Sequence, residues 1–318
     1  MPEDSKYDVI IVGAGVSGLT AGIYTCRKSL KTLIISKDVG GQALIAKEIE
    51  NYPGVERTGG ADLVQKVLAQ AQSFGAEIIL DEVESVLKKG EGEFHIQTSH
   101  GEYLAKAVII ASGKIPRDLN VPGEDRFKGM GVSYCAICDA PLYKNKKVLV
   151  VGDGSYAFDA VILLSKYAKE VHFVLKRKDL PRDQEDINLF EETKNVTIYY
   201  DTIVKEVKGT FKVVSVVLES IGKNVFELPV DGVFVELGYE IKVEPFKNLV
   251  TLDERKQVVV TGKNETSTSG VFASGDVTNT PFKQFVISAS EGAKAALSAY
   301  EYVQKISGKP AVTIDWHS

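Results

Sequence analysis

Cysteine is scarce in this chain, and its scarcity narrows the kind of protein that it encodes. Only three of the 318 residues are cysteine, which is too few for the disulfide-stapled scaffold of a small secreted protein. Two of them, Cys135 and Cys138, form a Cys-x-x-Cys pair, and Cys26 stands alone. In a reducing compartment, an isolated pair of this kind is more often catalytic or metal-binding than structural.

The chain also lacks an excess of positive charge and a long apolar run. Its 38 Lys and Arg against 43 Asp and Glu leave a net charge of −5, which offers no electrostatic attraction to nucleic acid or an anionic membrane. The apolar run from Val9 to Val12 is far too short for a signal core or a membrane span, and acidic residues precede it. We therefore expect no nucleic-acid or membrane partner, and a cytoplasmic location.

What the chain does contain is a pattern typical of dinucleotide-binding proteins. A β-rich run over Tyr7–Val12 is followed by a glycine cluster, a helical stretch from Val16 to about Ser29 and a second β-rich run over Thr32–Ser36. This order predicts one strand–helix–strand unit. The glycine cluster, Gly13-Ala14-Gly15-Val16-Ser17-Gly18, fits the G-x-G-x-x-G turn.

Each glycine of this turn has a physical reason to be there. The first permits the tight turn, the second lets the backbone approach a pyrophosphate, and the third allows close packing of helix on strand, while the helix N-terminus attracts the phosphates. Ser36 and Lys37 stand where such units usually carry an acidic residue for the ribose. A hydroxyl can still bind a ribose, so Ser36 is the candidate.

The same order returns in the middle of the chain. Lys147–Val151 is β-rich, Gly152–Ala157 forms a second glycine turn, Phe158–Tyr167 is helical and Glu170–Leu175 is β-rich again. Two nucleotide units in one chain suggest two redox cofactors that exchange electrons. After the second unit comes the basic run 176–178, which pairs favourably with a 2′-phosphate and favours NADPH over NADH. The alternative is a solvated basic turn.

The rest of the chain supplies connections and a closing segment. Turn residues from Ser112 to Pro122 and from Gly238 to Pro245 are typical of domain crossings. Further elements are expected at five places: a helix over Ala61–Phe74, a strand over Ala107–Ala111, β-rich pieces over Gln257–Thr261 and Val271–Ser274, and a helix from about Phe285 to Gln304. With 318 residues, two domains are expected.

The Cys135–Cys138 pair is the clearest candidate for chemistry. Two cysteines at this spacing can close a small disulfide ring, whereas zinc would need a second ligand pair. The four histidines, His95, His100, His172 and His317, are scattered without metal spacing, so we expect no metal. Asp139 follows the pair directly and could transfer the proton that thiol–disulfide exchange needs, although a surface Asp at a helix start is the plainer interpretation.

Taken together, these motifs resemble the low-molecular-weight thioredoxin reductases over nearly the whole chain. The segments that carry the resemblance share their order with the family: Gly40-Gly41-Gln42, residues 50–54 (ENYPG), Ala111-Ser112-Gly113, residues 131–139 (GVSYCAICD), residues 274–277 (SGDV) and Lys283-Gln284-Phe285. The redox segment and the late G-D-V motif together are specific to this family.

The resemblance implies an enzyme that moves electrons from NADPH through FAD to the cysteine pair and on to thioredoxin or a glutaredoxin-like protein. Cys138 would receive electrons from the flavin, Cys135 would attack the disulfide of the substrate protein, and Asp139 would be the acid. It places FAD against residues from both parts of the chain that flank the NAD(P) domain: Gly13, Gly15, Val16, Ser17, Gly18, Ser36, Gly41, Gln42, Asn51, Ser112, Gly113, Gly275, Asp276, Gln284 and Phe285. It places NADP against Gly152, Gly154, Ser155, Tyr156, Ala157, Lys176, Arg177 and Arg182. A homodimer is implied as well.

The sequence departs from the family at the nicotinamide site. The family motif for the 2′-phosphate, H-R-R-x-x-x-R, is matched only imperfectly by residues 175–182, and Tyr156 replaces a small residue beside the pyrophosphate. Other functions therefore stay open: a dithiol oxidase or an NAD(P)H-independent flavin disulfide reductase on the same scaffold, and a flavin redox-sensor module with poor turnover.

The fold predicted is α/β, with two Rossmann-like dinucleotide-binding domains. The NAD(P) domain, with the redox-active pair, is expected over residues 116–246. It is inserted into a discontinuous FAD domain made of residues 1–115 and 247–318.

Overall fold

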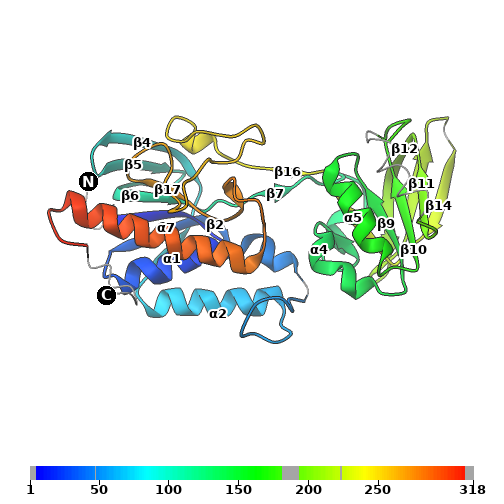
Figure 1. Ribbon diagram of the computed structural model, residues 1–318, viewed down its shortest axis with the longest axis horizontal. Coiled ribbons are helices and arrows are strands. Elements are labelled where there is room, and N and C mark those ends of the chain that lie inside the picture. The colour runs from blue at the N-terminus through cyan, green and yellow to red at the C-terminus, as the bar shows by residue number, and fades with distance from the viewer. Residues whose placement is uncertain (1–4, 47, 181–192, 223, 312–318) are drawn as a thin grey trace. The chain divides into compact units, whose positions relative to one another are not determined.

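The computed structural model describes residues 5–46, 48–180, 193–222 and 224–311 (Figure 1). The chain forms two compact units: unit 1 is Met1–Lys114 with Ile241–Ser318, and unit 2 is Ile115–Glu240. The first crossing lies one residue before the predicted boundary at 115, and the second lies six residues before the predicted boundary at 246 (246 − 240 = 6).

Unit 1 is built on a seven-stranded sheet of order β3-β2-β1-β6-β5-β4, with β17 paired to β6. Its strands are β1 (Lys6–Ala14), β2 (Thr32–Val39), β3 (Glu77–Leu80), β4 (Val83–Gly90), β5 (Glu93–Thr98), β6 (Glu102–Ile110) and β17 (Val271–Ala273). Five strands run parallel, whereas β4 and β5 are antiparallel additions. The central strands carry buried apolar runs, Val9–Val12, Leu33–Ile35 and Ala107–Ile110, because both of their faces are covered there.

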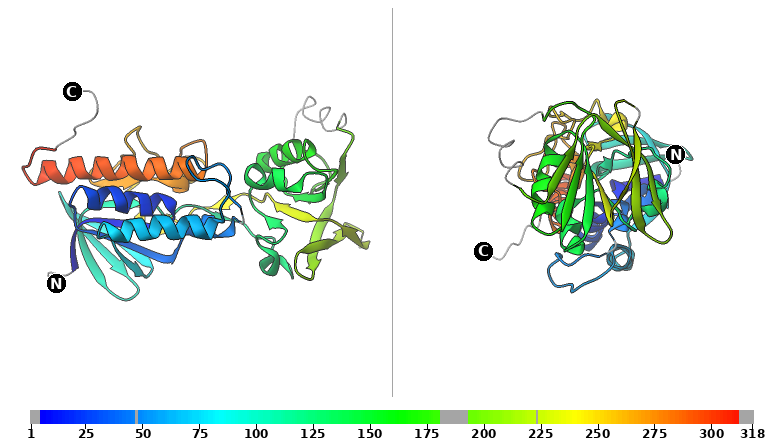
Figure 2. Two further views of the ribbon diagram at one scale, coloured as in Figure 1. Left: turned by 90° about the horizontal axis from the view of Figure 1, so that it is seen from below. Right: turned by 90° about the vertical axis from the view of Figure 1, so that its right-hand side faces the viewer.

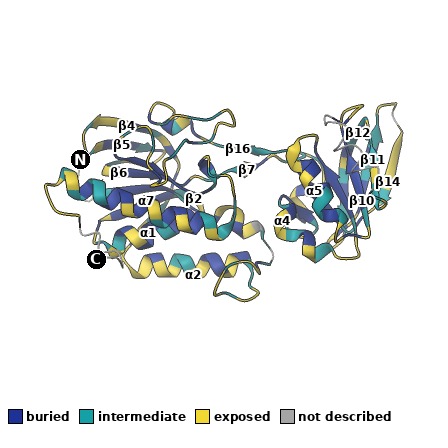
Figure 3. Ribbon diagram, viewed as in Figure 1, coloured by how far each residue is buried: buried dark blue, intermediate teal, exposed yellow. Residues whose placement is uncertain are grey.

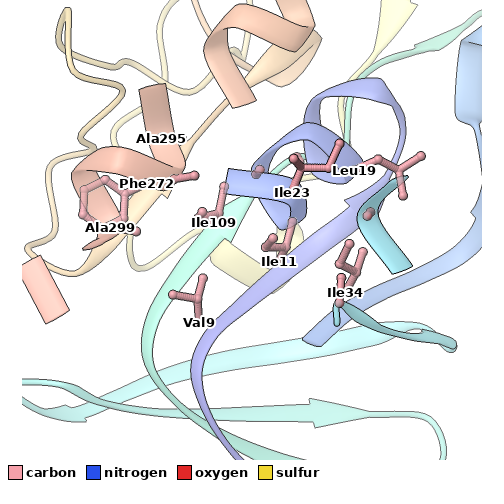
Figure 4. Close-up of a cluster of buried hydrophobic side chains, with 14 of the residues drawn as sticks. Val9, Ile11, Leu19, Ile23, Ile34, Ile109, Phe272, Ala295 and Ala299 are labelled. Carbon is pink, nitrogen blue, oxygen red and sulfur yellow. The ribbon is translucent and has the colours of Figure 1, made fainter. Parts of the chain in front are cut away.

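Helices cover one face of this sheet. Figures 1 and 2 show α1 (Val16–Arg27), α2 (Gly60–Ser73) and α7 (Phe285–Ile306) side by side along it. Val9, Ile11, Leu19 and Phe272 fill the core between helices and sheet (Figure 4). Helix α7 can approach α1 closely because residue 292 is glycine. A Cβ at Gly292 would collide with the backbone of α1. Short 3₁₀ turns complete the unit: η2 (Gly41–Ile45), η4 (Glu244–Phe246) and η5 (Gly275–Val277).

Unit 2 holds a five-stranded, wholly parallel sheet of order β11-β10-β9-β15-β8. These strands are β8 (Val132–Ser133), β9 (Lys147–Val151), β10 (Glu170–Val174), β11 (Val196–Tyr199) and β15 (Gly232–Val235). From β9 the chain moves outward through β10 and β11, and β15 returns to the other side of β9. The strand order therefore reverses between β9 and β15, the place where such sheets bind nucleotides.

Two layers enclose the parallel sheet of unit 2. One side carries α4 (Ala136–Asp139), η3 (Ala140–Tyr143) and α5 (Ser155–Ser165), and the other carries the antiparallel strands β12 (Thr202–Gly209), β13 (Val213–Ser220) and β14 (Val225–Pro229). The remaining elements are α3 (Glu124–Phe127) and the β7 (Ile115–Pro116) and β16 (Tyr239–Glu240) pair. In the parallel sheet β9, β10 and β15 are buried, whereas the outer antiparallel strand β14 is largely exposed (Figure 3).

The α/β fold class with two Rossmann-like units is confirmed. One predicted element is wrong: the β-rich piece Gln257–Thr261 forms no regular strand. Val258 makes only isolated bridges, to Leu252 and Thr278, so apolar β-branched residues there have no strand partner to extend along. The helix of the second unit also begins at Ser155 rather than at Phe158, because the turn is already complete at Gly154.

Candidate active site

The glycine turn of unit 1 leaves room for a phosphate at one position. A Cβ on Gly13 would collide with the carbonyl oxygen of Ala111, and a Cβ on Gly18 would collide with that of Gly13. A Cβ on Gly15, by contrast, would have no heavy atom within 4 Å. Gly15 also caps the N-terminus of α1, whose free backbone N–H groups attract anions. The first and third glycines thus serve packing, and the second faces open space.

The late G-D-V motif is bonded to this turn and to α7. The Ser17 hydroxyl donates to that of Ser274 at 2.7 Å. The buried carboxylate of Glu291 accepts the Gly275 N–H at 2.7 Å and also contacts the Thr278 and Thr280 hydroxyls. These bonds hold the backbone around Asp276, one of the residues predicted to contact FAD. Neither Ser274 nor Glu291 was among the predicted site residues.

Asp276 itself lies in a polar cluster. The Ser288 hydroxyl donates to Asp276 at 3.1 Å, and the ammonium of Lys114 lies 3.9 Å from its carboxylate. Lys283 donates to the Thr278 carbonyl at 2.6 Å. Burial lowers the pKa of Lys283 below its ordinary value, although Asp276 and Glu291 oppose that shift. A flavin bound here would meet two lysines and a carboxylate.

Two segments more than two hundred residues apart meet at the same end of unit 1. The Asn51 side-chain amide donates to Gln284 at 3.1 Å across a separation of 233 residues. The rings of Tyr52 and Phe285 pack edge to face, with centroids 6.0 Å apart. The structure thus brings together the two predicted flavin segments that contain these residues.

The remaining predicted flavin residues lie on loops and strand ends. Gly41 begins η2 close to Gly15, and Gln42 next to it is exposed. Ser112 and Gly113 follow β6 after Ala111, and a Cβ on Gly113 would meet open space. Ser36 lies within β2 and is half-buried. Val16 is the first residue of α1.

The glycine turn of unit 2 repeats the geometry of the first. A Cβ on Gly152 would collide with the carbonyl oxygen of Glu236, whereas one on Gly154 would have no heavy atom within 4 Å. The third position is Ala157, buried against the turn. Gly154 caps α5, and Ser155 is the first helical residue. This turn can therefore receive a second dinucleotide.

An aromatic pair and a basic turn flank this second turn. Tyr156 is 44% exposed, and its ring packs edge to face on that of Tyr239, with centroids 6.0 Å apart. Lys176 and Arg177 follow β10 and are exposed, and the Arg177 guanidinium lies 3.6 Å from the Asp179 carboxylate. Arg182, the third predicted cation, lies outside the described residues.

The cysteine pair follows β8 and spans the short helix α4. Cys135 and Cys138 form a disulfide with their Cα atoms 5.3 Å apart. The Cys138 backbone N–H donates to the Cys135 sulfur at 3.3 Å. Cys135 is half-buried and Cys138 is exposed. Cys26 is far from this site in sequence and packs against the core of unit 1.

Asp139 is held in place by a serine that sequence reasoning missed. The Ser133 hydroxyl donates to the Asp139 carboxylate at 2.6 Å, and the Cys135 backbone N–H donates to the same hydroxyl oxygen at 3.2 Å. Burial raises the pKa of Asp139 above the ordinary carboxyl value, with the Ser133 bond opposing. A carboxyl that stays protonated to higher pH is suited to the role of an acid.

The residue before the pair, Tyr134, anchors the redox segment. Its phenol contacts Asp118 at 2.7 Å and the buried carboxylate of Glu124 at 2.9 Å. Burial raises its pKa strongly, and the two carboxylates add to the shift. The Tyr239 hydroxyl donates to the Tyr134 carbonyl at 2.9 Å. The only sequence signal for this network was the position of Tyr134 beside the pair.

The arrangement of two dinucleotide turns and one redox disulfide agrees with the comparison to known families. The chain matches the pyridine nucleotide-disulphide oxidoreductase family over residues 7–297. It belongs to that family. The members of this family combine a flavin with a pyridine nucleotide, and the chain is therefore an NAD(P)H-dependent disulfide reductase.

The similar proteins of known sequence and structure show to which members of this family the chain is related. The thioredoxin reductase of Treponema pallidum is 37% identical over 309 residues, which cover 95% of this chain and 99% of that protein. The thioredoxin reductase of Bacillus subtilis is 36% identical, covering 96% and 98%. The crystal structure of thioredoxin reductase from Streptococcus pyogenes superposes with a TM-score of 0.91 at 32% identity, covering 95% of this chain and 100% of that one. The predicted resemblance is confirmed.

No described helix is long and apolar enough to cross a membrane. No group of three or more His, Cys, Asp or Glu among the same residues could hold a metal ion.

Proposed function

We propose that this chain is an NADPH-dependent thioredoxin reductase, in which FAD bound by unit 1 passes electrons to the Cys135–Cys138 disulfide of unit 2. The observation that carries the proposal is the disulfide itself, closed at the carboxyl edge of a nucleotide-binding sheet beside the half-buried carboxyl group of Asp139. The dithiol oxidase and the redox sensor are less favoured, because the chain matches the thioredoxin reductases of Treponema pallidum and Bacillus subtilis along nearly their whole length.

Unit 1 fits FAD. The open position at Gly15 and the N-terminus of α1 suit a pyrophosphate, and the Asp276 carboxylate can accept hydrogen bonds from ribityl hydroxyls. Asn51, Gln284 and Phe285, brought together in the fold, would line the ring. When bound, FAD supplies the two-electron relay between a nicotinamide and a disulfide.

Unit 2 fits a nicotinamide dinucleotide. Gly154 leaves the same open position at the N-terminus of α5 that Gly15 leaves in unit 1. The exposed side chains of Lys176 and Arg177 favour the 2′-phosphate of NADPH. Tyr156, beside the turn, is the residue that must accommodate the pyrophosphate.

The residues of the redox segment account for the exchange step. Reduction of the Cys135–Cys138 disulfide takes up two electrons and two protons and breaks the S–S bond. Cys135 loses its proton to solvent and attacks the substrate disulfide, and the protonated carboxyl of Asp139 gives its proton to the sulfur that leaves. Cys138 then gives its proton back to the Asp139 carboxylate and attacks the mixed disulfide. The Cys135–Cys138 bond re-forms, and the second substrate sulfur takes a proton from solvent and is released in the substrate dithiol. Ser133 keeps the Asp139 carboxyl in place.

The proposal is tested by the colour of the bound flavin. Under anaerobic conditions, NADPH should bleach the yellow holoprotein at lower concentration than NADH, and thioredoxin disulfide should restore the colour. Bleaching by a dithiol alone would favour the oxidase, and no bleaching by any of the three reagents would favour the sensor. Recolouring by a glutaredoxin-like protein but not by thioredoxin would assign a different substrate.

Two properties complete the proposal. We propose a homodimer, which sedimentation of the holoprotein at several concentrations tests directly. We also propose a cytoplasmic location, because a dithiol that must return to the reduced state suits a reducing compartment.

A further inference from the structure

The parallel sheet of unit 2 brings three elements to one edge. Because β9, β15 and β8 are neighbours and run parallel, their carboxyl ends lie side by side. The glycine turn begins at Gly152 after β9, and the redox pair begins at Cys135 after β8. Glu236 follows β15, the strand between them. A carboxylate therefore stands at the strand-order reversal, between the nucleotide turn and the disulfide.

Glu236 is fixed in this position by backbone and side chain. It is 7% exposed, and its backbone N–H donates to Val151 at 2.8 Å. Its carboxylate oxygen Oε1 accepts the Ala136 backbone N–H at 3.3 Å. Ala136 follows Cys135 directly and lies inside the disulfide ring. The Glu236 carboxylate is therefore held against the backbone that lies between Cys135 and Cys138.

We propose that the negative charge of Glu236 makes the Cys135–Cys138 disulfide harder to reduce and keeps both sulfurs protonated once it is reduced. An anion in a region of low dielectric disfavours a second anion nearby, here a thiolate. The reduction then takes two electrons from the reduced flavin and two protons from solvent, and it yields two S–H groups. A pair of low potential passes its electrons on to a substrate disulfide more readily.

Other groups that face the pair act on the thiols as well. The Cys138 N–H bond to the Cys135 sulfur favours a thiolate, but one neutral donor is weaker than a full charge. Asp139 on α4 adds a second carboxyl group, and burial raises its pKa, so it carries less negative charge than an ordinary Asp. Among the described residues, four tyrosines lie around the redox segment: Tyr134 before Cys135, Tyr239 bonded to the Tyr134 carbonyl, Tyr156 packed on Tyr239, and Tyr143, whose pKa burial and Asp139 raise.

Glu236→Gln tests the charge while keeping an acceptor oxygen for Ala136. In a Cys26→Ser background, the reduced holoprotein is alkylated at different pH values, and Cys135 is followed by mass spectrometry. We expect Cys135 to react about tenfold faster at pH 7, as a fall of one unit in the thiol pKa would produce. In thiol redox buffers, the potential of the pair should rise. Between about pH 7.5 and 8.5, where the variant thiol but not the wild-type thiol has lost its proton, the potential of the variant should fall with pH about half as steeply, because one proton rather than two accompanies reduction.

Asp231→Asn is the matched control. Asp231 lies at the other end of β15, where its carboxylate accepts the Lys147 backbone N–H at 2.9 Å. It should change neither alkylation nor potential. If Glu236→Gln behaves like wild type while Glu236→Ala does not, the carboxylate only holds the backbone and the proposal is wrong.

A measurement on the wild-type holoprotein covers the case in which Glu236→Gln does not fold. The Cys135 thiol should show a pKa at or above the ordinary value of about 8.5, and a lower value would overturn the proposal. The inference rests on the proposed function only for its electron donor. Alkylation and redox buffers need neither NADPH nor thioredoxin, so failed turnover and an unchanged potential are separate results.

Discussion

The two nucleotide turns share a backbone design but differ in their surroundings. In both, the first glycine packs against a neighbouring carbonyl and the second faces open space. Near Gly15, the segment 274–277 is held by two hydrogen bonds: one between the Ser17 and Ser274 hydroxyls, and one from the Gly275 N–H to the buried Glu291 carboxylate. Around Gly154, the flanking Tyr156 and the basic turn are exposed.

This difference teaches how one fold serves two kinds of cofactor. A site enclosed by hydrogen bonds from distant segments is suited to a group that stays bound through many turnovers. A site with exposed flanks is suited to a nucleotide that binds and leaves in each cycle. Unit 2 also carries the disulfide at the edge of the same sheet, so exchange of nucleotide and exchange of thiols share one unit.

The largest effect on turnover is expected at the disulfide, because its loss should abolish the chemistry of unit 2 and leave the flavin of unit 1 in place. Cys138→Ser should reduce thioredoxin turnover to background, because no disulfide can form, while unit 1 still holds flavin that NADPH bleaches. Turnover is followed by NADPH oxidation and flavin by its visible spectrum. Cys26→Ser, at the packed cysteine of unit 1, is the control and should remain active. Normal turnover by Cys138→Ser would contradict the assigned chemistry.

Asp139→Asn should lower kcat for thioredoxin reduction by about a hundredfold, since general acids contribute factors of this size. In wild type, kcat should fall as the pH rises through the raised pKa of Asp139, because the acid loses its proton. The Asn variant should lack this limb. A retained alkaline limb would assign it to another group.

Stability provides an independent check on Asp139. A carboxyl whose pKa is raised in the fold contributes stability that is complete below its unfolded pKa and is lost as the pH rises through the folded value. The unfolding free energy of Asp139→Asn should therefore rise relative to wild type across this window. Urea denaturation at several pH values measures it, and a constant difference would show that burial does not shift this group.

Alanine at Gly15 or at Gly154, the two glycines that face open space, should distinguish the two turns by the cofactor that each change affects. Gly15→Ala should keep the fold but retain less flavin. Gly154→Ala should keep its flavin but raise the KM for NADPH. The reason is that each added methyl group enters only the phosphate site of its own turn. Gly18→Ala, which collides with the Gly13 carbonyl, should instead lower the unfolding free energy by about 2 kcal/mol. Flavin loss in Gly154→Ala would mean that the sites are misassigned.

The smallest effect is expected at the basic turn. Arg177→Ala should raise the KM for NADPH by about tenfold, the worth of one charge-assisted hydrogen bond, and leave that for NADH nearly unchanged. Lys205→Ala, which removes an exposed ion pair with Glu219 elsewhere in unit 2, is the control. Equal changes for both nucleotides would show that Arg177 does not contact the 2′-phosphate.

The sequence by itself determined the fold class, both strand–turn–helix units and the redox pair. These are local patterns: glycines at fixed spacing, apolar runs of strand length and two cysteines three residues apart. The strand Lys147–Val151 was predicted at its observed bounds. Local pattern failed at Gln257–Thr261, because a β-rich run becomes a strand only if another strand lies beside it.

Only the tertiary structure decided which distant side chains surround these motifs. Glu236 lies 100 residues from Ala136, Glu291 lies 16 residues from Gly275, and Asn51 meets Gln284 across 233 residues. No short-range pattern marks such contacts, because they arise where parallel strands place their carboxyl ends together and where α7 packs on α1. The redox role of the cysteines could be predicted from the sequence. The carboxylate proposed to act on them, Glu236, is placed beside them only by the order of the strands in the sheet.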